Sequence, residues 1–389
     1  MYNEVGSRQN GWFATELSRD VFTVGSDIMR GYLTGLIDVI EKHKPEVSRA
    51  FFHYCRKGTL EKLFSPDAEI YCTHTAKLND DREIFEGCEL FLSFLHSNKG
   101  FPDHVIDMLR KNIMENINRF DPKDRGIPNV MPWTFSVSEV DDSPFQWKHY
   151  TDSQYGGYML AISKDKLESA IAALNKANAS SLLAQSQRTI LVFLPCLYIG
   201  VDDAIIKAAF ESVYVDMQES FEKIRVSSKG NDASLRDGIN VLTAIFFIAA
   251  IIKRNRFRHE HEWRIVLNAT EEVRKGAEET VGKPCLKTYI STGLNGRLNE
   301  LFVQVMCSPQ GNTRDLIQHA QHTLKECGSI LNVNTSNVSR SVVLNYIMRI
   351  PRDSRYEDYV IDKTSQNITA DVEPYESWIV NQRPVVSQV

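Results

Sequence analysis

The sequence contains none of the patterns that mark a disulfide-stabilised, zinc-ribbon or membrane-spanning protein. Its seven cysteines are scattered over 389 residues and form no CxxC pair, which argues against a disulfide framework and a zinc ribbon. The longest apolar stretch, Ile239 to Ile252, is short for a bilayer span and predicts a buried helix. Residues 1–10 lack a basic start followed by an apolar run, so no secretory signal is expected. We therefore expect a cytoplasmic protein.

The chain also lacks a charge surplus and a phosphate-binding loop. A formal net charge of -5 gives no overall attraction for nucleic acid, although a local basic groove stays open. The Gly156-Gly157 pair fits neither the GxGxxG nor the Walker spacing. A hydrophobic content of 42% with 24% charged residues is typical of globular proteins. The length allows one large domain or two ordinary ones.

Residues 256–267 concentrate two carboxylates, two imidazoles and three guanidiniums before an apolar end. The β-branched and aromatic residues at that end favour a strand, whose side chains alternate between two faces. This predicts Glu260, Glu262 and Arg264 on one face and Trp263 on a core face. Paired carboxylates beside an arginine form either the polar wall of a site or a solvated strand face. The segment alone leaves both interpretations open.

The remaining periodicity predicts an α+β protein with one mixed sheet flanked by helices. Strands are predicted at 50–56, 68–75, 133–138, 155–163, 189–199, 288–290, 301–306 and 332–338. Helices are predicted at 26–49, 88–95, 105–117, 165–176, 204–224, 239–252 and 313–327. We divide the chain into an N-terminal helical cap (1–49), an α+β core domain (50–350) and a docked C-terminal tail (351–389).

Two further features bear on a site. Alternation along 133–138 places Thr134, Ser136 and Ser138 on one face. This hydroxyl stripe faces either a cleft, where it would be useful, or water. His53 lies on an aromatic strand, where it is either a ligand-contacting residue or a core histidine. The Asn79-Asp80 pair is interpreted as a turn or helix cap, because its side chains bond nearby backbone amides.

The order of these signatures resembles the microbial family called domain of unknown function 2971 (DUF2971). The resemblance runs from about Ala50 to about Arg340, and its most specific part is a Glu-His-Glu-Trp-Arg block. The motifs that carry it are Phe52-His53-Tyr54, Leu78-Asn79-Asp80 with Glu83, Phe135-Ser136, Trp147-Lys148-His149-Tyr150, Gly156-Gly157, and Lys253 with Phe257 and Glu260 to Arg264. The family name supplies no activity.

The motif order is also similar to that of mono-ADP-ribosyltransferases, in which a histidine strand and a hydroxyl strand precede a Glu-x-Glu strand. This resemblance implies a split sheet that holds NAD as the ADP-ribosyl donor. It implies that His53 bonds the adenosine ribose and that Tyr71 or Tyr150 stacks on nicotinamide. Glu262 would serve the reacting ribose, because a fixed carboxylate stabilises oxocarbenium-like charge.

The same resemblance assigns Glu260 to orienting or deprotonating the acceptor. Arg56, Arg256 or Arg264 would meet the pyrophosphate. Tyr54 and Ser136 complete the implied cofactor-binding set, which includes no metal ligand. Similarity to transferase toxins further implies an intracellular microbial effector, such as a toxin or phage-defence component, that modifies a protein or nucleic acid. A cognate regulatory protein or an oligomer is expected, and a membrane is not.

Two other classes stay open. In a metal-dependent nuclease or phosphodiesterase, carboxylates would hold a divalent cation and basic residues would hold a nucleic-acid backbone. The residues for these roles are Asp80, Glu83, Glu260 and Glu262 for the cation, and Lys253, Arg254, Arg256 and Arg258 for the backbone. The His259-x-His261 pair has no identifiable third ligand and is insufficient for zinc. A non-enzymatic interaction module is the third class.

Overall fold

The computed structural model describes most of the central part of the chain and short segments at either end. The described residues are 35–40, 42–43, 50–78, 82–118, 130–180, 189–226, 235–269, 278–280, 283–294, 296–340, 342–343, 357–361 and 368–372. Most of the predicted N-terminal cap and C-terminal tail, together with the Asn79-Asp80 turn, lies outside them. Residues 35–40 are helical as expected.

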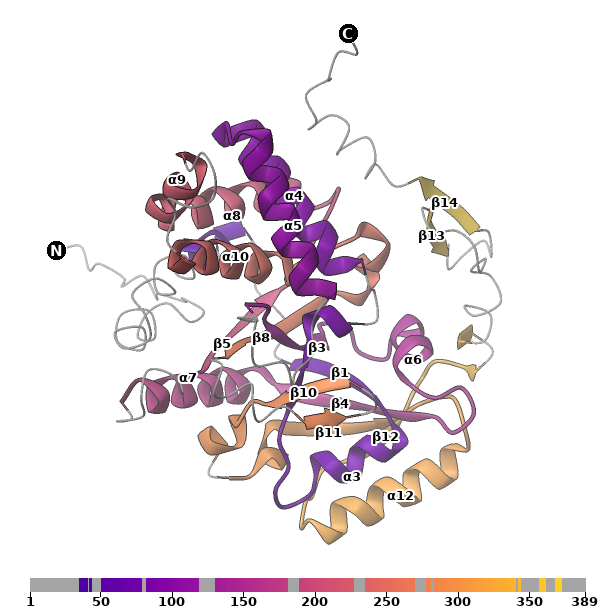
Figure 1. The fold of residues 1–389 in the computed structure, drawn as a ribbon. Coiled ribbons are helices and arrows are strands. Elements are labelled where there is room, and N and C mark those ends of the chain that lie inside the picture. Colours follow the sequence, from indigo (N-terminus) through magenta and orange to yellow (C-terminus); the bar gives the residue numbers. More distant parts are fainter. Residues whose placement is uncertain are drawn as a thin grey trace, which may run out of the picture.

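A mixed β-sheet forms the centre of the fold (Figure 1). Its strands are β1 (Ala50–Arg56), β2 (Tyr71–His74), β3 (Trp133–Ser138), β4 (Gly157–Ser163), β5 (Thr189–Pro195), β8 (Glu262–Ala269), β9 (Glu278–Thr280), β10 (Lys283–Lys287), β11 (Phe302–Cys307) and β12 (Val333–Thr335). All pairs in this sheet are antiparallel except β11 with β12. Two small sheets pair β6 (Leu197–Tyr198) with β7 (Ile252–Lys253) and β13 (Glu357–Ile361) with β14 (Ile368–Val372).

The central sheet splits beside β3. On one edge, β8 pairs with β3 along its whole length. On the other edge of β3, β2 pairs with Trp133 and Thr134, and β1 pairs with Ser138. No strand of the described residues pairs with residues 135–137 on that edge. One branch therefore runs through β1, β4, β11 and β12, and the other runs through β2, β10 and β9. The predicted α+β fold with a mixed, split sheet is confirmed.

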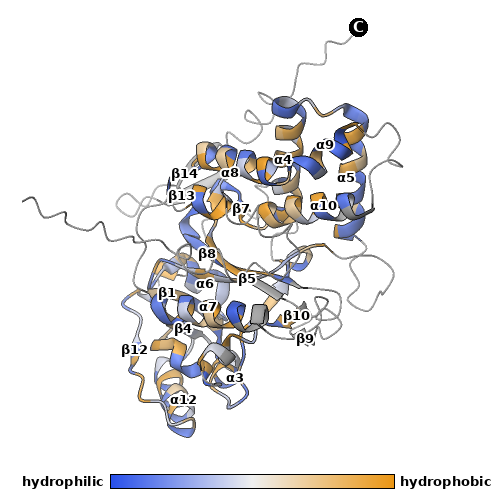
Figure 2. Cartoon of the chain, turned by 90° about the vertical axis from the view of Figure 1, so that its left-hand side faces the viewer, coloured by the Kyte–Doolittle hydropathy of each residue, from blue (hydrophilic) through white to orange (hydrophobic). Residues whose placement is uncertain are grey.

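Helices cover both faces of the sheet (Figures 1 and 2). The α-helices are α3 (Leu60–Leu63), α4 (Glu83–Lys99), α5 (Asp103–Asn118), α6 (Pro144–Tyr150), α7 (Lys164–Ser180), α8 (Asp203–Asp216), α9 (Gln218–Val226), α10 (Leu235–Ala249) and α12 (Thr313–Glu326). The 3₁₀-helices are η2 (Lys57–Thr59), η3 (Thr75–Lys77), η5 (Asn255–Glu260), η6 (Ile290–Leu294) and η7 (Leu298–Leu301). Helices α4, α5, α8, α9 and α10 pack together on one side, and α3, α7 and α12 cover the other.

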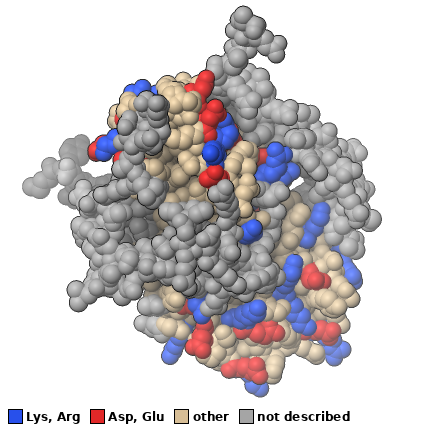
Figure 3. All heavy atoms as spheres, in the orientation of Figure 1, with Lys and Arg blue, Asp and Glu red and all other residues tan. Residues whose placement is uncertain are grey.

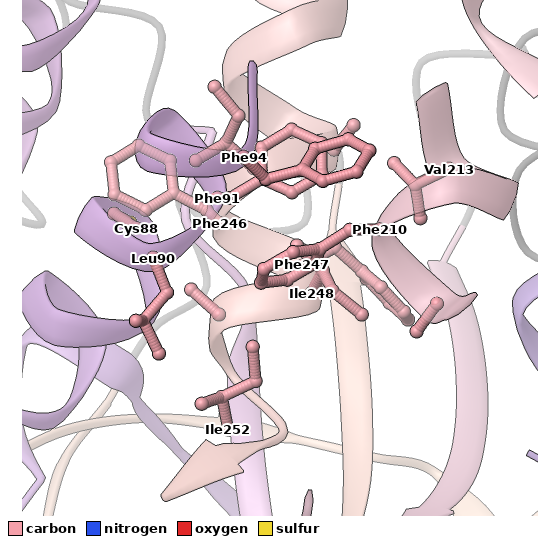
Figure 4. Packing of buried hydrophobic residues seen from close by; sticks show 14 of the residues in the cluster. Cys88, Leu90, Phe91, Phe94, Phe210, Val213, Phe246, Phe247, Ile248 and Ile252 are labelled. Atoms are coloured by element: carbon pink, nitrogen blue, oxygen red, sulfur yellow. The ribbon is translucent and has the colours of Figure 1, made fainter. Parts of the chain in front are cut away.

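Strand β8 is buried on both faces. Val266 joins the helical-side core, where aromatic residues of α4, α8 and α10 such as Phe91, Phe210 and Phe247 pack together (Figure 4). Trp263 and Ile265 belong to the core on the opposite side of the sheet. The core face predicted for Trp263 is confirmed, and the solvated-face interpretation is wrong because Glu262 and Arg264 are only 5% and 2% exposed.

Three strand predictions are wrong, and the predicted helix 204–224 is divided into α8 and α9. Glu260 lies in η5 and not in the strand, because His261 adopts a left-handed backbone with φ of 41° before β8 begins. Residues 288–290 are not a strand, since Tyr289 also has a positive φ and η6 starts at Ile290. The predicted strand 189–199 is divided into β5 and β6.

The buried helix expected from the apolar stretch is confirmed as α10, which is a central part of the helical-side core. Within the described residues, no helix has the length and apolarity needed to cross a membrane. Helix α10 approaches α4 closely at Gly87, where an added Cβ would lie 2.8 Å from Ala249 Cα. The absence of a side chain at Gly87 therefore sets the spacing of the two helices.

Two glycine-to-alanine changes should have opposite effects on the free energy of unfolding. Gly87→Ala should lower it by about 1–3 kcal/mol, because the new methyl group meets backbone atoms of α10. Gly238→Ala, in α10 with open space around its Cα, should leave it unchanged or raise it by up to about 1 kcal/mol through helix propensity. Urea denaturation measures both values. Equal effects would contradict the close approach of α4 and α10.

Candidate functional site

The split between β1 and β2 opens into a cleft of about 880 Å³. Strands β1, β2 and β3 supply eleven of its lining residues, and the segment from Thr59 to Glu69, which contains α3, supplies eight. Most residues predicted for the transferase site line it, namely His53, Tyr54, Arg56, Tyr71, Ser136, Tyr150, Glu260 and Glu262, whereas Arg256 and Arg264 do not. Arg264 instead contacts Glu262, with 2.6 Å between Arg264 Nε and Glu262 Oε1. The structure thus brings together residues that are up to about two hundred positions apart in sequence.

Beside this cleft lies a buried ion cluster, which we define as Glu83, Lys253, Glu260, Glu262 and Arg264. Lys253 Nζ lies 2.6 Å from Glu260 Oε2 and also donates to Glu262 Oε2. Arg264 Nη2 lies 2.5 Å from Glu83 Oε1. No side chain in the cluster is more than 5% exposed. Three carboxyl groups share two cations, so full ionisation would leave one negative charge in excess.

The backbone on either side of His261 is held by polar contacts, which fixes both carboxylates. The carbonyl oxygen of Glu260 accepts hydrogen bonds from Ser138 Oγ at 2.6 Å and from Gln146 Nε2 at 3.0 Å. The amide of Glu262 donates to the hydroxyl of Tyr198 at 2.8 Å. The left-handed turn at His261 therefore directs two acidic side chains from different elements toward one ammonium group.

Glu262 is held as a carboxylate. Its Oε1 accepts hydrogen bonds from Ser136 Oγ and Arg264 Nε, and its Oε2 accepts one from Lys253. Burial opposes ionisation, but the charges of Arg264 and Lys253 outweigh it and hold the pKa of Glu262 well below its usual range. A carboxylate in this setting stays negatively charged throughout the physiological range.

Glu260 has the opposite character. Burial, opposed by Lys253 and reinforced by the charge of Glu262, raises the pKa of Glu260 to about 7. Tyr150 donates its hydroxyl to Glu260 Oε1 at 3.1 Å, and burial raises the pKa of Tyr150, so it remains a donor. Two neighbouring carboxyl groups with separated pKa values suit a pair in which one exchanges protons and the other supplies fixed charge.

His53 is neutral and faces the cleft. Burial lowers the pKa of His53 to about 4, although its ring bonds the carbonyl oxygen of Ser136. The ring nitrogen Nδ1 lies 3.1 Å from that oxygen, so we assign the proton to Nδ1 and acceptor character to Nε2. The ring also packs on Phe135, with 4.5 Å between centroids. His53 is half-buried and lines the cleft, which favours the ligand-contacting interpretation.

Tyr54 has a hydroxyl that serves the fold. It donates to the carbonyl oxygen of Val140 and accepts from the amide of Ser143, both at 3.0 Å. Its ring packs edge-on against Trp147, which is fully buried as expected for a core tryptophan. Tyr54 therefore lines the cleft with its ring while its hydroxyl is occupied.

Two basic residues that the nuclease interpretation would use to bind a nucleic acid are buried in ion pairs within the fold. Lys253 and Arg254 are 4% and 5% exposed, and Arg254 forms a two-pronged ion pair with Glu86. Neither is accessible to a nucleic-acid backbone. On the face shown in Figure 3, Lys and Arg of the described residues are interspersed with Asp and Glu. Asp80 lies outside the described part of the chain.

Lys253 also occupies the place that a cation would need between Glu260 and Glu262. Across the described ranges, no group of three or more His, Cys, Asp or Glu side chains is arranged to hold a metal ion. An ammonium and a guanidinium of the chain itself therefore supply the positive charge of the cluster.

The ion cluster falls largely within a recognised family segment. Residues 146–265 match the model of a family described as Protein of unknown function (DUF2971). The DUF2971 resemblance is thereby confirmed over that segment, which is shorter than the expected 50–340. No curated protein and no solved structure matches the chain. The DUF2971 segment contains Tyr150, Lys253, Glu260, Glu262 and Arg264, whereas the β1, β2 and β3 walls of the cleft lie before it.

Sequence reasoning did not identify the central role of Lys253. The nuclease interpretation assigns it to the backbone of a nucleic acid, together with neighbouring arginines. Its signal in the sequence is its position directly after the buried apolar stretch that forms α10 and β7, since a lysine there must find a buried partner. Gln146 and Tyr198, whose side chains form hydrogen bonds with the backbone of Glu260 and Glu262, were also not predicted as part of the site.

The protonation of Glu260 should make stability depend on pH. Between its ordinary pKa of 4.5 and its raised pKa of about 7, the folded protein keeps a proton that the unfolded chain releases. The contribution of Glu260 is therefore fully present below pH 4.5 and is lost as the pH rises through 7. The free energy of unfolding of wild type relative to Glu260→Gln should fall from pH 5 to 7, by at most about 1.4 kcal/mol per pH unit.

Urea midpoints at successive pH values measure this difference. Glu219→Gln, at an exposed position of α9 where the partner Lys223 stays charged over this pH range, is the matched control and should show no such trend. A constant difference between wild type and Glu260→Gln from pH 5 to 7 would contradict a raised pKa for Glu260.

Proposed function

We propose that this chain is an ADP-ribosyltransferase-like enzyme that uses NAD as the donor and acts on it through Glu262. The observation that carries the proposal is the pair Glu260 and Glu262 at the floor of the cleft, with pKa values displaced in opposite directions. The split sheet adds support, because it gives an extended ligand access to both carboxylates.

The proposed reaction transfers the ADP-ribosyl group from nicotinamide to an acceptor. The bond between the nicotinamide nitrogen and C1′ of the ribose breaks, and nicotinamide leaves with the electron pair. Positive charge develops on the ribose, and the Glu262 carboxylate stabilises it. The acceptor forms a bond to C1′ and gives its proton to Glu260, whose pKa of about 7 suits a general base.

The walls of the cleft suit the other parts of the donor. The unprotonated Nε2 of His53 accepts a hydrogen bond from a ribose hydroxyl in this proposal. Arg56, exposed at the end of β1, suits the pyrophosphate. Arg264 does not suit the pyrophosphate, because its guanidinium is 2% exposed and forms ion pairs with Glu262 and Glu83. It also donates to the carbonyl oxygen of Ala250. Arg264 instead stabilises the negative charge of the Glu262 carboxylate.

The acceptor and the biological setting are part of the proposal. A protein or nucleic-acid acceptor, and a role as an effector or toxin in phage defence, follow from the resemblance to transferase toxins. We rank a metal-dependent nuclease lower because Lys253 Nζ lies between the carboxylates that would hold the metal.

Glu262→Gln should reduce nicotinamide release from NAD by about 10²- to 10³-fold, because the fixed negative charge next to the reacting ribose is lost. Glu260→Gln should depress transfer to the acceptor more than NAD cleavage. Purified protein is assayed with carbonyl-labelled nicotinamide in NAD, with cell lysate as the source of acceptors. Glu219→Gln, which changes an exposed residue of α9, should keep full activity.

Wild-type protein that neither releases nicotinamide in lysate nor binds NAD would contradict the proposal. Cleavage of nucleic acid that depends on an added divalent cation would then support the nuclease. Specific partner binding by a catalytically silent protein would support the interaction module.

A further inference from the structure

Three small polar residues form a row across three neighbouring strands on one side of the cleft. In the strand register, Thr134 of β3 pairs with Thr73 of β2, and Thr73 pairs with Cys285 of β10. All three residues line the cleft. Thr73 Oγ1 lies 3.7 Å from Cys285 Sγ. Directly paired residues point to the same face of a sheet, so the three side chains form one continuous polar strip.

The hydroxyl of Thr134 makes no hydrogen bond within the described part of the chain. Thr134 is 3% exposed, and a buried hydroxyl without a partner destabilises the folded state. Thr75, two residues after Thr73, provides a contrast. It is 1% exposed, and its hydroxyl donates to the carbonyl oxygen of Pro132 at 2.9 Å. An unpartnered buried hydroxyl that lines a cleft is available to a ligand.

The strip suits a neutral hydrogen-bonding group. Hydroxyl groups both donate and accept, which matches a carboxamide with its amine donors and its carbonyl acceptor. Among the described residues that line the cleft, β2, β3 and β10 supply no cationic side chain. Lys287 of β10 does not line the cleft but lies over the ring of Tyr71. An anionic group at the strip would be desolvated in the same cleft as the Glu262 carboxylate.

The position of the strip fits a planar ring attached to the reacting carbon. Thr134 and Ser136 are two residues apart on the same face of β3, a spacing of about 7 Å. Ser136 donates its hydroxyl to Glu262, so the strip begins one side-chain spacing from the proposed reaction centre. Tyr71 precedes Thr73 by two residues on β2 and also lines the cleft, which places an aromatic ring on the same face.

We propose that Thr134, with Thr73 and Cys285, forms a specificity-determining subsite that accepts a neutral carboxamide on a planar ring and rejects the corresponding carboxylate. The identity of the ring rests on the proposed function, in which nicotinamide is the leaving group. The role of Thr134 is binding only, and it takes no part in proton transfer.

The test compares nicotinamide with nicotinic acid as free ligands, with dissociation constants measured by NMR titration. Wild type should bind nicotinamide and should bind nicotinic acid at least about tenfold more weakly. Thr134→Val, which removes the hydroxyl at nearly constant volume, should weaken nicotinamide binding about fivefold to tenfold. Its melting temperature should be unchanged or higher, because no protein hydrogen bond is lost. Thr134→Ser, which keeps the hydroxyl, should bind nicotinamide within about twofold of wild type.

Thr75→Val is the matched control, with the opposite expected effects on melting temperature and on nicotinamide binding. It loses the hydrogen bond to Pro132, so its melting temperature should fall while nicotinamide binding stays at the wild-type level. Equal affinity of wild type for the two ligands, no binding of nicotinamide, or unchanged binding by Thr134→Val would each overturn the subsite.

The subsite and the proposed function fail in distinguishable ways. If the binding pattern holds but no variant or condition yields NAD turnover, the transferase proposal falls and the subsite stands. If Glu262→Gln abolishes NAD turnover while Thr134→Val changes neither turnover nor nicotinamide affinity, the subsite falls and the transferase proposal stands.

Discussion

The ammonium group of Lys253 is the interaction on which the site depends. It lies between Glu260 and Glu262 in an almost fully buried position, where an unpaired charge would cost several kcal/mol. Together with Arg264 it compensates two of the three carboxyl groups in the cluster. The third carboxyl group has no cation of its own, and the contacts identify it as Glu260, because Glu262 bonds both cations. Its pKa of about 7 lets it exchange a proton near neutral pH. An apparently structural ion cluster thus produces two carboxyl groups with different chemical characters.

The split of the sheet makes this cluster accessible. β8 closes one edge of β3 completely, whereas β1 and β2 leave the middle of the other edge uncovered. The packed helices α4, α5, α8, α9 and α10 bury the cations from one side. The cleft therefore meets the cluster only at Glu260 and Glu262. All of these side chains are almost fully buried, but only the two carboxylates line the cleft that a ligand would enter.

The fold class, β1, β3 and the core face of β8 could be predicted, because they follow from local alternation of apolar and polar residues. The position of Glu260 could not, because it depends on the left-handed backbone of His261, which a two-residue period does not encode. The role of Lys253 depends on the parallel β6–β7 pair, a contact between segments about fifty residues apart. The subsite at Thr134 depends on the register of three strands. The order of motifs still identified His53, Ser136 and Glu262, because these residues lie on strands beside the split.

The most direct measurement of the central claim is a crystal structure of the protein with a non-hydrolysable NAD analogue. The account predicts the analogue in the split between β1 and β2. Its nicotinamide ribose should lie against the Glu262 carboxylate, and its carboxamide should bond Thr134. Lys253 should still bridge Glu260 and Glu262. A bound analogue at any other place, or no binding at saturating concentration, would contradict the account.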